Sequence, residues 1–171
     1  MADFGRLGKV RTTREIELRD ITELFRVRSA TDENRLTREE LAALGITESS
    51  VKEKLLGTWK GWLCEENGTV VGFAIGDKSS GEMWVIAVLP SHIRQGIGGR
   101  LLTTVESWLF AAGCSEIWLT TDIDVQLRAY SFYRNRGWTD WKIEKGNRYM
   151  KKRPNQSAPP TPGSITPRAT E

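Results

Sequence analysis

Apolar residues recur at helical spacing near the start of the chain. A short strand is expected at residues 10–11, before this pattern begins. The apolar positions that follow are Ile16, Leu18, Ile21, Leu24, Phe25 and Val27. Residues three and four apart lie on one face of a helix, so the spacing predicts a helix over residues 15–28 with one buried face.

Two shorter helices are expected between residues 37 and 56. In LTREELAALG, Thr37 stands three residues before Glu40, the pattern of a capping box at a helix start. Gly45 then supplies the glycine that commonly follows a helix end. The next helix would be capped by Thr47 or Ser49. The first third of the chain is therefore expected to form a charged, helical wall rather than part of the sheet core.

The middle of the chain changes to the alternation that is typical of strands. WKGWLCEE and TVVGFAIGD flank Asn67-Gly68, which predicts a two-stranded antiparallel hairpin. A third strand, EMWVIAVL, ends at Pro90. Its alternation predicts one face made of Glu82, Trp84, Ile86 and Val88.

The remaining pattern alternates helices with strands. A helix over residues 98–112, a strand EIWLTT, a helix over 125–136 and two last strands near 138–141 and 148–151 are expected. The main elements follow the order β-α-α-β-β-β-α-β-α-β-β, a mixed α/β fold. Residues 1–152 are expected to form a single domain. Residues 153–171 are rich in Pro, Ser and Thr without apolar periodicity, which predicts a disordered tail.

Composition excludes several classes of function. The 171 residues carry a formal charge of +3 without a one-sided basic block, so we expect no nucleic-acid partner. Cys64 and Cys114 match no metal-ligand spacing and His92 is the only histidine, which argues against a metal site or a Ser–His–Asp triad. The start lacks the apolar core of a signal peptide and no apolar run is long enough to span a membrane. We therefore expect a cytoplasmic protein with no membrane partner.

The stretch AVLPSHIRQGIGGRLL joins a strand to the start of a helix through three glycines. The unpaired N–H groups at such a junction, with the helix dipole, favour an anion of phosphate type. Gly96, Gly98 and Gly99 would let it approach the backbone, and Arg94 and Arg100 add positive charge. The alternative is a glycine-rich turn that only starts the helix. A P-loop is excluded because Gly99 is followed by Arg-Leu-Leu, and a dinucleotide fingerprint is excluded because Leu101 replaces its third glycine.

Two motifs resemble the GCN5-related N-acetyltransferases, the GNAT superfamily, and its small bacterial members in particular. VLPSHIRQGIGGRLL is similar to the family's motif A, Q/R-x-x-G-x-G/A after a strand ending in V-x-P. VQLRAYSFYRNRGW is similar to its later helix, N-x-x-A-x-x-x-Y followed by glycine and an aromatic residue. The resemblance covers roughly residues 9–152. Ile93 stands at the Gln/Arg position of motif A, and Gln126 at the asparagine position of the helix.

The resemblance implies a mostly antiparallel sheet flanked by helices, and acetyl-CoA as donor to a primary amine that attacks directly in a ternary complex. The backbone of Ile86 and Val88 would pair with the pantetheine arm. The remaining implied contacts to the donor are Arg94, Gln95, Gly96, Ile97, Gly98, Gly99, Arg100 and Gln126. An acyl-CoA sensor of the same fold without turnover is the alternative function.

The resemblance also implies catalytic residues. Tyr133 stands where the family keeps its general acid, although it could instead be a buried core aromatic. Glu82 lies fourteen residues before Gly96, where histone-acetylating members carry a glutamate base, although a hydrated glutamate at a strand start fits equally. Asp122 and Asp124 are rival bases. His92 is expected near the diphosphate rather than the thioester.

The acceptor pocket is expected between the helical first third and the sheet edge. Trp84 and Asp122 are the substrate-contact candidates, and Glu33 and Asp124 could attract a cationic acceptor. The other tryptophans that could form walls are Trp59, Trp62, Trp138 and Trp141. We expect a small-molecule amine rather than a protein lysine, with a homodimer left open.

Overall fold

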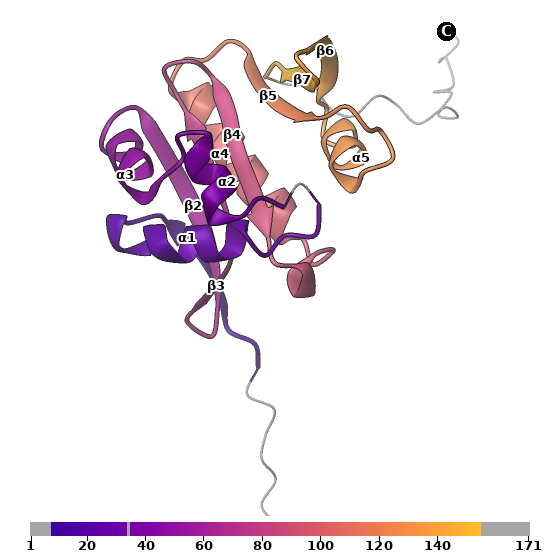
Figure 1. Cartoon of the computed structure of the whole chain (residues 1–171). Helices are drawn as coiled ribbons and strands as arrows, with labels where there is room; N and C mark the ends of the chain where they lie inside the picture. Colours follow the sequence, from indigo (N-terminus) through magenta and orange to yellow (C-terminus); the bar gives the residue numbers. More distant parts are fainter. Residues whose placement is uncertain (1–7, 34, 155–171) are drawn as a thin grey trace, which may run out of the picture.

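A seven-stranded sheet runs through the part of the chain that the structure describes, residues 8–33 and 35–154 of a computed structural model (Figure 1). Its strands are β1 (Arg11–Glu15), β2 (Trp59–Glu66), β3 (Thr69–Asp77), β4 (Glu82–Val88), β5 (Ile117–Asp122), β6 (Thr139–Glu144) and β7 (Asn147–Lys152). They lie in the order β1-β2-β3-β4-β5-β7-β6. Every neighbouring pair is antiparallel except β4 and β5. The expected mixed, mostly antiparallel sheet is confirmed. Of the tail predicted at residues 153–171, residues 155–171 lie outside the described residues.

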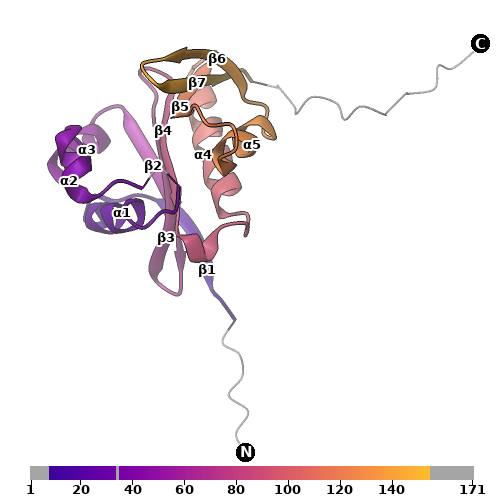
Figure 2. The ribbon, with the colours of Figure 1, turned by 45° about the vertical axis from the view of Figure 1, so that its right-hand side comes forward.

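Helices cover both faces of this sheet (Figure 2). The helices are α1 (Ile21–Arg28), α2 (Arg38–Ala43), α3 (Glu48–Leu56), α4 (Ile97–Ala111) and α5 (Arg128–Arg134). The first three pack over one face, and α4 and α5 lie on the other, with buried side chains of both in one apolar cluster. None of the described helices is long and apolar enough to cross a membrane.

The N-terminal region contains three α-helices before β2, as the residue pattern predicts, whereas the condensed order of elements gave only two. Reciprocal hydrogen bonds between Thr37 and Glu40 and between Thr47 and Ser50 form capping boxes at α2 and α3. The box at Thr37 was predicted, and of the two caps considered for the next helix, Thr47 or Ser49, the structure has Thr47. The helix predicted over residues 15–28 is shorter, because β1 continues to Glu15, which pairs with Trp62. A 3-10 turn at Leu18–Asp20 then leads into α1.

The hairpin of β2 and β3 turns at Asn67-Gly68, as predicted. Both residues have positive φ, 50° and 79°, the conformation that an Asn-Gly turn needs between twisted strands.

The predicted common face of β4 is wrong, because the strand contains a bulge. Gly76 pairs with Met83 and Ile75 with Val85, so Trp84 is an extra residue relative to β3. Ile86 and Val88 therefore pack towards the α4 cluster, whereas Trp84 packs towards the clusters under α1 and α3.

The strands β4 and β5 separate almost as soon as they meet. They share one residue pair, Glu82 with Trp118, and the Trp118 amide donates to the Gly81 carbonyl at 3.0 Å. Beyond this point β5 is drawn away by its pairing with β7, which extends from Ile117 to Asp122. The backbone of residues 83–88 is thereby left without a strand on one side.

The two helices that follow β4 and β5 begin at special turns. α4 begins after Gly96, whose φ of 79° is in the left-handed region. α5 begins later than the predicted residue 125, because the carboxylates of Asp122 and Asp124 accept amide hydrogen bonds from Asp124 and Gln126 and form turns there. Asp124 thus caps a turn before the helix, and Leu127 is the N-cap of α5.

A buried carboxylate ties α4 to the C-terminal strands. Glu106 accepts a hydrogen bond from the Trp138 indole at 2.8 Å and from Lys152 Nζ, also at 2.8 Å. Trp138 is fully buried and meets the ring of Tyr133 edge to face. The network holds the wall against which α5 packs.

We predict that Glu106→Ala destabilises the protein by about 2–4 kcal/mol, because it leaves the Trp138 N–H and the Lys152 ammonium without their shared acceptor in a mostly buried site. Chemical denaturation measures the change. The control is Glu144→Ala, which removes an exposed pair with Lys142 and should change stability by less than about 0.5 kcal/mol. Equal effects of the two substitutions would contradict a structural role for Glu106.

Candidate active site

A cavity of about 510 Å³ lies where β4 and β5 separate. One wall is the whole of residues 83–88 of β4, and the other is made by Thr120 and Thr121 of β5 with most of α5. The glycine loop between β4 and α4 forms one end. Arg28, the last residue of α1, and residues 31–33 of the segment that follows form the other. The cavity is therefore a direct consequence of the strand separation.

The glycine loop presents the N-terminus of a 15-residue helix to the cavity. Arg94 and Gly96 both adopt left-handed φ, 60° and 79°, which turns the chain sharply into α4. Gly98 and Gly99, in the first turn, line the cavity, where helix N–H groups have no intrahelical acceptor. A Cβ at Gly99 would lie 2.8 Å from the guanidinium of Arg136, so this glycine makes room for a cation that also lines the cavity. The loop thus combines helix amides with two arginines, as an anion site requires.

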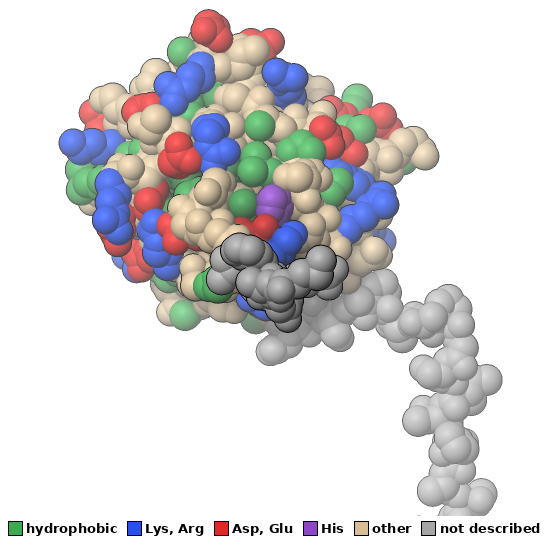
Figure 3. Space-filling model, turned by 90° about the horizontal axis from the view of Figure 1, so that it is seen from below, with side chains coloured by type: hydrophobic (Ala, Val, Ile, Leu, Met, Phe, Trp, Pro, Cys, Tyr) green, Lys and Arg blue, Asp and Glu red, His purple; other side chains and the backbone are tan. Residues whose placement is uncertain are grey.

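An ionic network fixes this loop to the edge of the sheet. Glu66 of β2 accepts hydrogen bonds from Arg11 at 2.6 Å and from His92 at 3.0 Å. Arg11, then His92, lowers the pKa of Glu66 to about 2. Arg11 also donates to the side chain of Gln95, which donates to the Ser91 carbonyl. Figure 3 shows the single histidine among charged side chains on this face.

Tyr133 lies on the opposite wall, in α5. Its ring is 7% exposed and packs edge to face against Phe132 and Trp138. Among the described residues none hydrogen-bonds its hydroxyl, although the residue lines the cavity. Burial raises the pKa of Tyr133 well above its usual value, so the phenol keeps its proton at neutral pH.

Part of the predicted site is brought together in this cavity. The predicted residues that line it are Trp84, Ile86, Val88, Arg94, Gly96, Gly98, Gly99 and Tyr133. The predicted residues outside the lining are Glu82, Gln95, Ile97, Arg100, Asp122 and Gln126. Ile97 is buried in the α4 cluster, the side chains of Arg100 and Gln126 are exposed, and Asp122 is engaged in the turn before α5. Of the five tryptophans considered as walls, Trp84 lines the cavity and Trp138 is core.

Glu82 lies at the closed end of the β4–β5 junction, next to cavity-lining Met83 and Trp84. Burial raises the pKa of Glu82, and the like charge of Asp77 adds to this effect. Among the described residues, no group of three or more His, Cys, Asp or Glu side chains could hold a metal ion.

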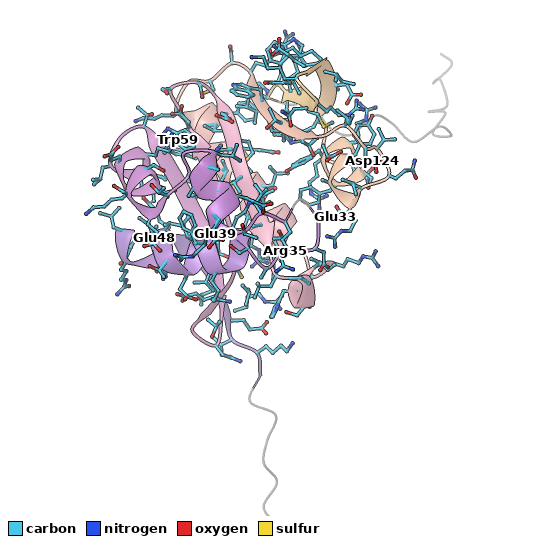
Figure 4. All side chains as sticks on the ribbon, in the orientation of Figure 1. Glu33, Arg35, Glu39, Glu48, Trp59 and Asp124 are labelled. Carbon is cyan, nitrogen blue, oxygen red and sulfur yellow. The ribbon has the colours of Figure 1, made fainter. Side chains whose placement is uncertain are left out.

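Charged residues at the far end of the cavity were mostly missed by sequence reasoning. Glu33, in the segment after α1, accepts a hydrogen bond from the Arg128 amide at 3.3 Å and lies 3.5 Å from its guanidinium. Figure 4 shows Glu33 on the side of that segment facing α5. Arg28 and Asp32 line the same end. No local pattern could have paired residues 33 and 128, which are 95 positions apart.

The model of the acetyltransferase (GNAT) family matches residues 21–138, more than half of the chain. The chain belongs to the GNAT acetyltransferase family. Its general reaction is therefore acetyl transfer, and the resemblance seen in the two sequence motifs is confirmed. The matched segment contains the complete cavity lining.

Solved structures of GNAT proteins share the fold at low identity. The PaiA N-acetyltransferase of Thermoplasma acidophilum, in complex with coenzyme A, is 16% identical with a TM-score of 0.73 and covers 84% of this chain and 99% of its own. The ribosomal-protein-S18-alanine N-acetyltransferase of Escherichia coli is 18% identical (TM-score 0.67; 91% of this chain, 100% of its own). Ard1 of Thermoplasma volcanium is 20% identical (TM-score 0.64; 84% of this chain, 97% of its own). At these identities the likeness shows the fold alone.

Proposed function

We propose that the protein transfers an acetyl group from acetyl-CoA to the primary amine of a small molecule, by direct attack in a ternary complex. The observation that carries this proposal is the cavity itself, in which an unpaired strand edge, a helix N-terminus and a protonated tyrosine face one space. Each feature matches one part of a thioester donor.

The donor fits this cavity in two segments. The amide-bearing pantetheine arm would pair with the free backbone edge at residues 86–88, as a strand would. The diphosphate would sit at the amides of Gly98 and Gly99, with Arg94 and Arg136 adding positive charge. The coenzyme A complex of the PaiA protein, which has the same fold, supports this assignment.

The reaction then needs one proton donor. The amine nitrogen attacks the thioester carbon, a C–N bond forms, the C–S bond breaks and the sulfur leaves as a thiolate. A backbone N–H near Val88 would polarise the carbonyl. Tyr133 would donate its proton to the leaving thiolate, since burial raises the pKa of Tyr133 and keeps its phenol protonated.

The amine must lose a proton before it attacks, since a free alkyl amine has a pKa near 10.4. Glu82 would receive this proton through water, because it stands one residue outside the cavity lining. Its raised pKa makes it a better base than an ordinary carboxylate.

We predict that the wild-type protein binds acetyl-CoA and releases CoA thiol with a suitable amine, and that Tyr133→Phe lowers turnover by about 10²-fold or more because it lacks the proton donor. Calorimetry measures binding, and a thiol reagent follows turnover. Binding should be unchanged, since the substitution keeps the ring packing against Phe132 and Trp138.

The matched control is Tyr130→Phe on the same helix, whose hydroxyl bonds Asp140 outside the cavity and should leave turnover unchanged. Unchanged turnover in Tyr133→Phe would return this residue to a purely structural role. Binding of acetyl-CoA by the wild type without turnover of any amine would favour the sensor function.

We predict that Glu82→Gln lowers kcat by about 10²-fold and removes one limb of its pH profile. Because the base works only when deprotonated and its pKa is raised above 4.5, wild-type kcat should fall as the pH falls through that raised value. The limb of the pH profile that arises from deprotonation of the acceptor amine should persist in the variant. If Glu82→Gln kept the wild-type kcat and pH profile, and Asp32→Asn lost both, the base would be Asp32 instead.

A further inference from the structure

A second, smaller cavity lies beside the main one, beneath α1, α2 and α3. Its volume is about 110 Å³. Arg28, Trp84 and Val85 line both cavities, so the two spaces are neighbours at the bulge of β4. The smaller cavity therefore lies within reach of a group bound at the strand edge.

The smaller cavity is apolar. Its described lining consists of aliphatic and aromatic side chains apart from Arg28, among them Leu24, Leu41 and Val51. A cavity of this volume holds about three to four groups of water size, and one of about 150 Å³ accepts a benzene ring. The space thus fits a branched aliphatic chain of three or four carbons better than an aromatic ring.

The junction of the two cavities carries opposite charges. Arg28 lines both spaces, and Asp32 lines the acceptor end of the main cavity. Glu33 and Arg128, which line that end as well, neutralise each other as an ion pair. Burial lowers the pKa of Arg28, so an anion beside it would be favoured. This arrangement is complementary to a zwitterion, an ammonium and a carboxylate on one small molecule.

Resting on the acetyl transfer proposed above, we propose that the acceptor is a free α-amino acid with a branched aliphatic side chain, of the size of leucine or isoleucine. The side chain occupies the smaller cavity, the carboxylate meets Arg28, and the α-amine faces the free edge of β4. These three groups share one carbon atom, and the residues common to both cavities provide such a point of convergence. The amine nitrogen gains the acetyl group and loses a proton to Glu82 through water, while the C–S bond breaks and Tyr133 protonates the leaving CoA thiolate.

The first experiment compares acceptors with the full-length protein. Thiol release is measured with L-leucine, L-isoleucine, glycine, L-phenylalanine, L-lysine, L-leucinamide and 3-methylbutylamine. We expect kcat/KM for leucine and isoleucine to exceed that for glycine by about 10-fold or more, because glycine leaves the apolar cavity unfilled. Leucinamide and 3-methylbutylamine, which lack the carboxylate, should also be at least about 10-fold poorer than leucine.

The second experiment fills the cavity. Ile46→Phe, at a half-buried position of the lining, should raise KM for leucine about 10-fold with no change in acetyl-CoA affinity. Val51 also lines the cavity but is buried, so Val51→Phe repeats the test in case the ring introduced at position 46 turns out to solvent. The control is Leu44→Phe. Leu44 lies two residues from Ile46, is 66% exposed and lines neither cavity, so KM for leucine should stay unchanged. Arg28→Met should reduce the preference for leucine over leucinamide.

The outcomes separate this inference from the function on which it rests. Failure to bind acetyl-CoA would reject both. Turnover of other amines without preference for leucine or isoleucine would overturn the acceptor assignment alone. Calorimetric titration of L-leucine into the protein saturated with CoA gives a reading independent of turnover: saturable binding, weakened by Ile46→Phe, supports the inference, and no binding overturns it.

Discussion

The separation of β4 from β5 is the constraint on which the site depends. A strand in the middle of a sheet normally pairs on both sides, because unpaired backbone N–H and C=O groups are costly unless water or a ligand satisfies them. Here β4 pairs with β3 along its length, but with β5 only at Glu82 and Trp118. The bulge at Trp84 and the attachment of β5 to β7 both turn the strands apart. The resulting gap is a polar edge inside an otherwise continuous sheet, which an amide-bearing donor can complete.

The rest of the fold places charge and acid at the two walls of this gap. α4 starts at the end of β4, so its N-terminus points into the cavity without a long connection. The network of Glu66, Arg11, His92 and Gln95 holds the loop from behind with side chains of β1 and β2. On the other wall, Glu106 and Trp138 form the packed surface that positions the ring of Tyr133. Arg11, Glu66, Glu106 and Trp138 lie outside the cavity lining, whereas His92 also lines the cavity.

The sequence predicted the features that depend on local pattern. The hairpin at Asn67-Gly68, the capping box at Thr37, the glycine turn before α4 and Tyr133 on a helix all follow from spacing within a few residues. The face of β4 could not be predicted, because the extra residue at Trp84 exists only relative to the register of β3. Arg136 was missed because its place depends on the bare backbone of Gly99 in a different helix. The acceptor end, with Arg28, Asp32 and the pair of Glu33 and Arg128, is likewise formed by segments far apart in the chain.

The central claim is that the gap between β4 and β5 binds acetyl-CoA through the first turn of α4. Calorimetric titration of acetyl-CoA into the wild type, Gly98→Ala and Gly98→Glu tests it most directly. A Cβ at Gly98 would make only ordinary contact with the Phe132 ring, at 3.6 Å, so alanine should be tolerated. A glutamate there would bring bulk and negative charge to the helix N-terminus, and we predict a loss of affinity of about 100-fold or more. Equal affinity in the glutamate variant and the wild type, with both proteins folded, would contradict the account.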